Sequence, residues 1–272
     1  MPSDAKKLIL GLISGLSLEQ VKPFFLSLEK SGYRGDVCMA VSDLGVATQA
    51  FLRARRVQLI PFQKAFLKNF SEHAAKLPGI VLSRRRRPLF DRQLAPAYMH
   101  PRCARYFFYQ SYLQECGGAY GHTLLADVRD VLFQADPFAP EWPEGLCVFM
   151  ENGAPNQEPA APLAAATGVI LGTGTAVREH LAGLTGILCQ KRDRKPIDKA
   201  VHNFLVHQER AAKLHRFENL SGPVANLGNL DPTRLQFAAG GQIVAASGQI
   251  VNIVHQYDRH PDLKQKLAAL LT

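Results

Sequence analysis

Two acids follow a short apolar run in the stretch His122-Thr-Leu-Leu-Ala-Asp127-Val-Arg-Asp130-Val-Leu-Phe-Gln-Ala-Asp136-Pro-Phe138. The run predicts a buried β-strand that ends at Asp127. Strand ends in open α/β sheets are rigid and face the crevice in which ligands bind. Carboxylates are typical ligands of Mg²⁺ and Mn²⁺, which use one or two of them beside phosphate oxygens. The stretch therefore predicts an α/β protein that presents a divalent cation at one edge of its sheet.

The residues before this stretch predict alternating strands and helices. We expect strands over residues 8–13, 37–41 and 57–60. The helix after the first strand begins with the capping-box pattern Ser17-Leu-Glu-Gln20, contains Pro23 and ends at Gly32. Residues 101–116 predict another helix, and their many aromatic side chains are more typical of a packed core than of a ligand platform.

The residues after the acids continue this alternation. We expect strands over residues 146–150 and 169–171, a surface loop over 152–166, helices over 175–190 and 197–208, and a tight hairpin of 242–246 with 249–254. The pattern favours one domain over residues 1–272, built as a three-layer α/β/α sandwich with a mostly parallel central sheet and a small C-terminal hairpin.

Composition restricts the partners of the chain. Lys and Arg number 32 against 23 Asp and Glu, a formal net charge of +9 that favours anionic partners. The densest basic cluster is Arg84, Arg85, Arg86 and Arg87, for which we keep two interpretations, a solvated loop and a contact with an anionic acceptor or a membrane surface. Basic residues do not alternate with aromatic ones along one element, so nucleic acid is not an expected partner.

Cysteine usage and hydropathy indicate a compartment. The five cysteines are scattered and include no Cys-x-x-Cys pair, so we expect neither a disulfide framework nor a zinc site. The apolar stretch at residues 8–16 is short and lacks a cleavage site, so we interpret it as a strand rather than a signal peptide. No apolar run approaches the roughly 20 residues of a membrane span. We expect a soluble cytoplasmic protein.

Several short motifs, in order and spacing, resemble nucleotide-sugar glycosyltransferases of the GT-A fold, and most of all the glycosyltransferase family 8 type. The motifs are Arg105 on its helix, the acid stretch above, Thr167-Gly-Val-Ile-Leu-Gly172, Ile197-Asp-Lys-Ala-Val-His-Asn203 and Ile253-Val-His255. The resemblance covers nearly the whole chain. It implies transfer of a sugar from a nucleoside diphosphate donor, with a UDP-sugar as the expected donor, to an unknown glycan, lipid or small-molecule acceptor.

The resemblance also implies a metal site. In such enzymes an Asp-x-Asp at a strand end and a C-terminal histidine bind Mn²⁺ or Mg²⁺, and Asp130 and His255 match the second acid and that histidine. The first acid is displaced to Asp127, which gives Asp-x-x-Asp. The alternatives are that either acid caps the turn and pairs with Arg129, and that His255 is a structural core residue.

Four further residues are carried over from the resemblance. Arg105 would hold the nucleotide-sugar, although a solvated surface arginine is its alternative. Asp198 would lie near the reaction centre as the catalytic residue, or else cap a helix. Gly168 would let the chain pass close to the sugar, and Ser14 would lie where the nucleoside binds. Lys199 and Ala166 stand where the family has glutamine and asparagine.

Two other functions stay open at this point. A sugar nucleotidyltransferase would share the architecture, but it is expected to have a glycine-rich basic loop after the first strand, where this chain has only Ser14-Gly15. A non-catalytic protein of GT-A-like fold could use its basic surface to bind anionic ligands or membranes, because a fold by itself does not establish an activity.

Overall fold

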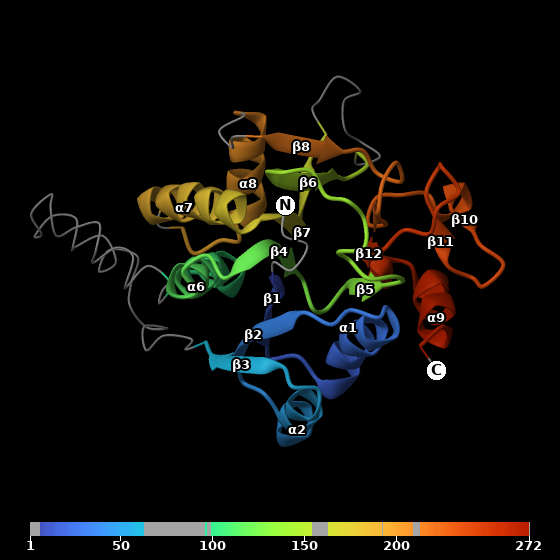
Figure 1. Cartoon of the computed structure of the whole chain (residues 1–272), viewed down its shortest axis with the longest axis horizontal. Coiled ribbons are helices and arrows are strands. Elements are labelled where there is room, and N and C mark those ends of the chain that lie inside the picture. The colour runs from blue at the N-terminus through green and yellow to red at the C-terminus, as the bar shows by residue number, and fades with distance from the viewer. Residues whose placement is uncertain are drawn as a thin grey trace, which may run out of the picture.

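The computed structural model describes residues 6–62, 96, 99–153, 163–191, 193–208 and 213–271. Figure 1 shows a central sheet with helices on both sides and a smaller C-terminal part beside it. The arginine cluster at residues 84–87 lies outside the described residues, as does most of the loop predicted over 152–166.

Seven strands form the central sheet in the order β3-β2-β1-β4-β7-β6-β8. Their bounds are β1 Lys6–Ser14, β2 Asp36–Ser42, β3 Gln58–Pro61, β4 Tyr120–Ala126, β6 Leu146–Met150, β7 Ala165–Thr173 and β8 Leu214–Phe217. All neighbouring pairs are parallel except the two that include β7. The sheet is therefore mostly parallel, and the arrangement is consistent with a GT-A-like fold.

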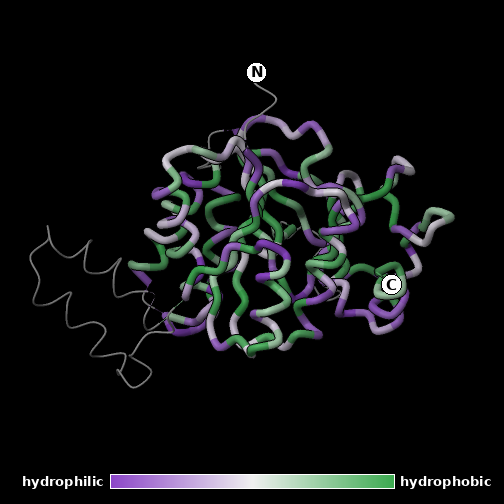
Figure 2. Tube along the Cα trace, turned by 60° about the horizontal axis from the view of Figure 1, so that its bottom comes forward, coloured by the Kyte–Doolittle hydropathy of each residue, from purple (hydrophilic) through white to green (hydrophobic). Residues whose placement is uncertain are grey.

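Helices cover both faces of this sheet, as the alternating side chains of β1 require. Leu8 and Leu10 pack with α6 (Pro101–Glu115), α7 (Gly174–Lys191) and α8 (Asp198–His207). Ile9 and Ile13 point to the other face and pack with α1 (Leu18–Lys30) and α2 (Val46–Ala54). Figure 2 shows the hydrophobic residues concentrated in these inner elements, so the three predicted layers are confirmed.

Local sequence signals account for the helix ends. The Gln20 backbone N–H donates to Ser17 Oγ and the Ser17 N–H donates to Gln20 Oε1, so the predicted capping box starts α1. α1 runs through Pro23, and Gly32 follows its end with a φ of +82°. The aromatic residues of α6 are core residues, as predicted: Tyr106, Phe107, Tyr109 and Tyr112 are buried, and Phe108 packs against them.

A second sheet extends from the acid stretch to the C-terminal part. It joins β5 (Val131–Phe133), β12 (Ile253–His255) and β9 (Val224–Asn226), with β12 antiparallel to β5 and parallel to β9. A separate core under this sheet includes Leu263 and Leu267 of α9 (Pro261–Ala269). In Figure 1, α9 lies beside β5 and the hairpin strands.

The predicted hairpin is confirmed at its turn and at its first residue pairs, but not over the full length of its strands. The chain does turn at Gly248, whose N–H donates to Ala245 O, but only an isolated bridge from Val244 to Ile250 follows. The C-terminal hairpin instead pairs β10 (Gln236–Phe237) with β11 (Ile243–Val244), because the residues after Ile250 pair with β5 and β9. Strands β5, β8, β9 and β10 were not predicted.

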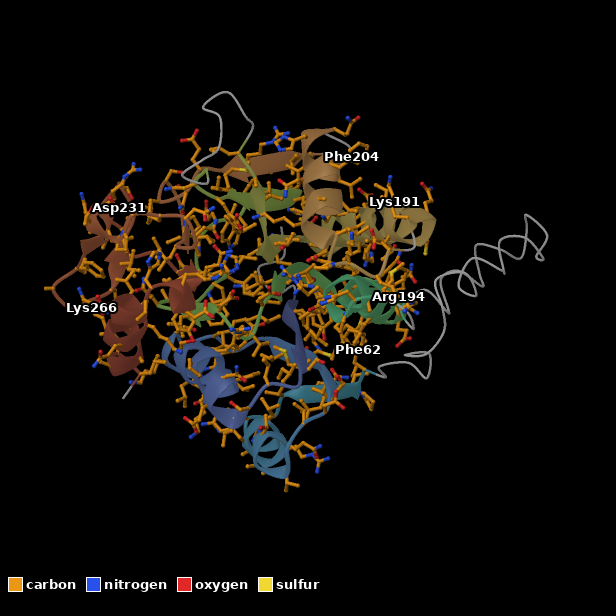
Figure 3. The ribbon with its side chains drawn as sticks, turned by 180° about the vertical axis from the view of Figure 1, so that it is seen from behind. Phe62, Lys191, Arg194, Phe204, Asp231 and Lys266 are labelled. Carbon is orange, nitrogen blue, oxygen red and sulfur yellow. The ribbon has the colours of Figure 1, made fainter. Side chains whose placement is uncertain are left out.

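The outer surface of the described part is mainly polar. Few large apolar side chains are exposed there, among them Phe204 on the outer side of α8, which Figure 3 labels with charged residues such as Asp231 and Lys266. None of the described helices is both long and apolar enough to cross a bilayer. All five cysteines are free thiols, as their scattered positions predict.

Candidate functional site

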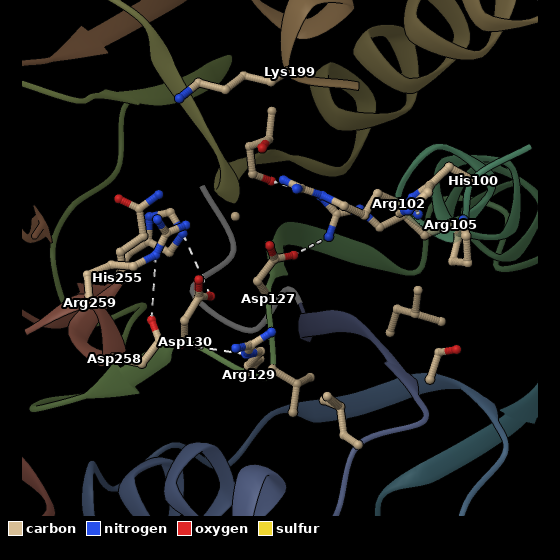
Figure 4. Close-up of a pocket in the computed structure, with 18 of the residues that line it drawn as sticks. His100, Arg102, Arg105, Asp127, Arg129, Asp130, Lys199, His255, Asp258 and Arg259 are labelled. Atoms are coloured by element: carbon tan, nitrogen blue, oxygen red, sulfur yellow. Dashed lines mark hydrogen bonds and ion pairs between the residues drawn. The ribbon is translucent and has the colours of Figure 1, made fainter. Parts of the chain in front are cut away.

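A pocket of about 770 Å³ opens where β1 and β4 end. Leu12, Ser14 and Leu16 contribute one wall, and the turn Asp127–Asp130 contributes the floor. The pocket therefore lies at the carboxyl ends of parallel strands, the edge where open α/β sheets bind ligands. Most of the remaining lining is charged or polar: His100, Arg102, Arg105, Glu151, Thr167, Lys199, His255, Gln256, Asp258 and Arg259 (Figure 4).

Asp127, Asp130 and His255 form a cluster that could hold a metal ion. One ligand atom from each lies within 4.8 Å of the other two. The second sheet brings them together, because β5 starts directly after Asp130 and its first residue, Val131, pairs with His255. The Gln256 N–H also donates to Asp130 O at 2.7 Å. Residues from distant parts of the chain are thus fixed at one place, as the sequence predicts.

His255 presents its Nε2 atom to the acids. Asn226 Nδ2 donates to Met150 O at 3.0 Å, which turns Asn226 Oδ1 toward His255 Nδ1 at 2.7 Å. The His255 Nδ1–H therefore donates to this oxygen and the Nε2 lone pair stays available, 3.8 Å from Asp130 Oδ1. Burial lowers the pKa of His255 to about 4, so the ring is neutral at pH 7, which metal binding requires.

Within the described part of the chain, the charge of Asp130 is only partly balanced by the nearby arginines. Its Oδ1 is buried and has no hydrogen bond within the described part of the chain. Burial, and then the nearby carboxylates of Asp127 and Asp258, raise the pKa of Asp130 to about 7. A divalent cation would supply both the missing contact and the missing charge. The residues present therefore fit a metal ion bound by Asp127, Asp130 and His255.

Asp127 has a guanidinium partner, but that partner is not Arg129. Its carboxylate pairs with Arg105 Nη1, while its backbone N–H donates to Gly168 O at 2.9 Å. Arg129 instead lies 3.6 Å from Asp258, so the alternative in which Arg129 neutralises the acids is wrong. Asp127 still lines the pocket, since a quarter of its side chain is exposed.

Arg105 is buried, which excludes the solvated-surface alternative. Its Nη2 donates to Tyr106 Oη at 2.9 Å and lies 3.6 Å from Asp198 Oδ2. Its guanidinium thus reaches both Asp127 and Asp198 and lines the pocket between them. These contacts hold the planar group in one orientation at the pocket wall.

Asp198 lies behind Arg105 rather than in the pocket lining. It is the first residue of α8, and Ile197 occupies the N-cap, so the helix-cap alternative is wrong. The side chain is fully buried, with Arg105 at 3.6 Å and Arg102 at 3.7 Å. This position makes Asp198 the counter-charge that orients the two arginines. A direct catalytic role for it stays a prediction.

Gly168 and Ser14 both line the pocket. A Cβ on residue 168 would lie 2.2 Å from His255 Nε2, so glycine at this position makes room for the histidine ring. The contact of Gly168 with a sugar stays a prediction. Ser14 ends β1 and its Oγ accepts a hydrogen bond from Ser42 Oγ at 2.8 Å, a position compatible with the nucleoside contact predicted for it.

Several lining residues escaped the sequence interpretation. The polar segment after His255 was a signal for Arg259 and Asp258, which form an ion pair at the rim of the pocket. The sequence marked Lys199 only as standing where the resembling family has glutamine. In the structure its ammonium group forms an ion pair with the buried Glu151. Asn226 carries no sequence signal, because it follows two small buried residues and nothing nearby predicts its contact with His255.

No family model matches the chain, and no curated protein matches it either. Among solved structures, the chain is similar to one described as PaToxG glycosyltransferase, with a TM-score of 0.44 and 14% sequence identity over 75% of this chain and 70% of that one. The function proposed below therefore rests on the pocket and on the motifs of the chain itself.

Proposed function

We propose that this protein is a metal-assisted glycosyltransferase that moves a sugar from a nucleoside diphosphate-sugar, most suitably a UDP-sugar, to an acceptor. The observation that carries the proposal is the cluster of Asp127, Asp130 and His255 in a pocket that is also lined by basic side chains. A divalent cation and arginines together are the groups that bind a diphosphate. The motif resemblance to GT-A glycosyltransferases supports the sugar as the transferred group.

The residues that line the pocket suggest separate roles in binding the metal, the diphosphate and the sugar. Asp127, Asp130 and His255 would hold Mn²⁺ or Mg²⁺, which when bound shields the charge of the departing diphosphate. Arg129 and Arg259 also line the pocket, oriented by Asp258, and would contact the phosphate oxygens. Beside the cluster Arg105, which contacts Asp127 and Asp198, would orient the sugar.

This arrangement favours transfer by leaving-group stabilisation and positioning. The charged groups are fixed before substrate arrives, because Asn226, Gly168 and the second sheet hold His255 and the acids in place. The connection between β1 and α1, residues 15–17, contains no basic residue, which argues against the nucleotidyltransferase alternative.

The test is nucleotide binding with and without metal. Calorimetric titration of the protein with UDP, ADP, GDP, CDP and TDP should show binding of one nucleoside diphosphate, expected to be UDP, that requires Mn²⁺ or Mg²⁺. Asp130→Asn keeps the shape of the side chain and removes its charge, so it should abolish the metal-dependent binding of the nucleoside diphosphate. Asp262→Asn, a change of an exposed acid in α9, is the matched control and should bind as the wild type does.

Turnover tests the transfer itself. Incubation with a panel of UDP-sugars and Mn²⁺ should release UDP, at first by slow hydrolysis when no acceptor is present. Failure of every nucleoside diphosphate to bind in the presence of metal would refute the proposal. Metal-independent binding to anionic vesicles or polyanions in its place would establish the non-catalytic alternative.

A further inference from the structure

The side of the pocket lined by α6 and α8 carries more positive charge than a neutral sugar needs. Three basic residues line it: Arg102, Arg105 and Lys199. Arg102 lies in the first turn of α6, Arg105 lies in the next turn of the same helix, and Lys199 lies in the first turn of α8. Figure 4 shows Arg102 and Arg105 side by side on α6, with Lys199 reaching in from α8. Asp198 lies within 3.7 Å of Arg102 and 3.6 Å of Arg105, so it joins the starts of the two helices.

The acids in this region do not balance these three cations once the proposed metal ion takes up the charge of Asp127. Asp198 faces Arg105 and Arg102, and Glu151 pairs with Lys199. Asp127 also touches Arg105, but its charge belongs to the metal cluster. One positive charge is therefore left over, and the geometry assigns it to Arg102, whose closest acid is at 3.7 Å and whose side chain is 50% exposed.

The helix dipoles add to this excess. Arg102 and Lys199 lie in the first turns of α6 and α8, where the helix dipole is positive and acidic residues are favoured. The first turn of α6 contains no acidic residue. Arg105 Nε is buried and has no hydrogen-bond partner within the described ranges, which leaves a further donor unsatisfied in this region. An anionic ligand group would offset the positive charge of Arg102 and of the two helix dipoles.

Building on the proposed function, we propose that the group bound on this side of the pocket is itself anionic, a carboxylate or phosphate carried by the donor sugar or by the acceptor, and that Arg102 with Lys199 selects it. A guanidinium binds either group in a bidentate manner, and the half-exposed side chain of Arg102 is free to turn toward it. The substrate class would then be a uronic acid or a phosphorylated sugar rather than a neutral hexose.

The first arm of the test concerns the donor. With Mn²⁺ present, calorimetry compares UDP, UDP-glucose, UDP-galactose, UDP-glucuronic acid and UDP-galacturonic acid. One charge-assisted contact predicts about 10- to 100-fold tighter binding of an acidic sugar nucleotide than of its neutral counterpart. Arg102→Gln should remove most of this preference. Arg129→Gln, beside the metal cluster, is the control and should weaken acidic and neutral donors by the same factor.

The second arm concerns the acceptor. The protein loaded with UDP and Mn²⁺ is titrated with glucuronic acid, glucose 6-phosphate and glucose. Binding of a charged sugar but not of glucose, lost in Arg102→Gln, would place the anionic group on the acceptor. The double variant Glu151→Gln/Lys199→Gln removes both charges of the second ion pair without leaving either one unpaired, and it should lower the preference in whichever arm shows it.

The outcomes separate the two proposals. If UDP binds with metal but neither arm favours a charged sugar, the inference about Arg102 is overturned and the glycosyltransferase proposal stands. A preference that survives Arg102→Gln also overturns the inference. If no nucleoside diphosphate binds, the proposed function fails and this inference fails with it.

Discussion

Gly168 and His255 are in direct contact, and the histidine occupies the space that a side chain on residue 168 would need. A Cβ at this position would come within 2.2 Å of Nε2 and within 3.0 Å of two ring carbons. His255 is also held by Asn226 on its other side. The ring is therefore fixed between a strand of the central sheet and a strand of the second sheet, with one nitrogen directed at Asp130.

The substitution Gly168→Ala should therefore act on metal binding. The added methyl displaces the His255 ring, and we expect Mn²⁺ affinity, measured by calorimetry or electron paramagnetic resonance, to fall by about 10-fold or more. Gly186→Ala, in α7, is the matched control, because its Cβ would meet nothing within 4 Å. The control should leave Mn²⁺ affinity unchanged and raise the free energy of unfolding by up to about 1 kcal/mol. Equal Mn²⁺ affinities for wild type and Gly168→Ala would contradict the contact.

Asn226 should influence the metal without touching it. Asn226→Ala removes the acceptor of the His255 Nδ1–H, and loss of such a partner reduces metal affinity by about 10- to 100-fold. The NMR shifts of the ring nitrogens should report a mixture of tautomers in the variant and a single one in the wild type. Asn229→Ala, a change of an exposed residue nearby, should leave both measurements as they are in the wild type.

Asp130 should make the metal-free protein less stable as pH rises. Its pKa of about 7 in the folded chain is above the ordinary value of 3.8 for an aspartate, so the folded state holds a proton between about pH 4 and 7 that the unfolded state has lost. The free energy of unfolding therefore decreases across this interval. Without metal, Asp130→Asn should be more stable than the wild type by about 1–3 kcal/mol at pH 8, and the difference should vanish near pH 4.

Saturating Mn²⁺ supplies the control for this effect. The ion stabilises only the chain that binds it, so at pH 8 the wild type should recover stability and Asp130→Asn should not. Thermal and urea unfolding at several pH values give the comparison. In the absence of metal, the wild type could instead gain stability from pH 4 to 7 relative to Asp130→Asn. That result would contradict the prediction, because it would show that the folded protein already balances the charge of the Asp130 carboxylate.

Arg105 should stabilise the fold through Asp198. Arg105→Met leaves the fully buried Asp198 carboxylate with Arg102 alone and also removes the partner of Asp127, and breaking a buried ion pair in this way costs about 3–5 kcal/mol. Asp198→Asn in the same chain removes the unpaired charge, so the double variant should recover much of the loss in urea unfolding. Additive effects of the two single changes would mean that the residues do not interact.

The sequence specified the parts of the fold that have strong local signals. The apolar run before Asp127, the Ser17–Gln20 capping box and the aromatic helix over residues 101–116 each became the predicted element, because burial and local hydrogen bonds decide such segments. β8 and β9 gave no such signal. They have four and three residues, and β8 includes His215 and Arg216, so neither shows an apolar period.

The residues of the site were only partly predictable. Asp127, Asp130 and His255 end or follow apolar strands, and the structure brings them together. Asp198 follows no such rule, since its burial against Arg105 depends on how α6 and α8 pack. Arg102 and Asn226 act through tertiary contacts with residues far away in the chain, and a single sequence does not record these contacts.

The pairing of β5 with β12 ties the metal cluster to completion of folding. Two of the proposed ligands come from the middle of the chain and the third from near its C-terminal end, so a partly folded chain whose last strand has not docked would hold the acids without the imidazole. Metal affinity would thus report on the final folding step. A change that loosens the C-terminal core around Leu263 should lower metal affinity, through loss of His255 from the site, before it unfolds the rest of the protein.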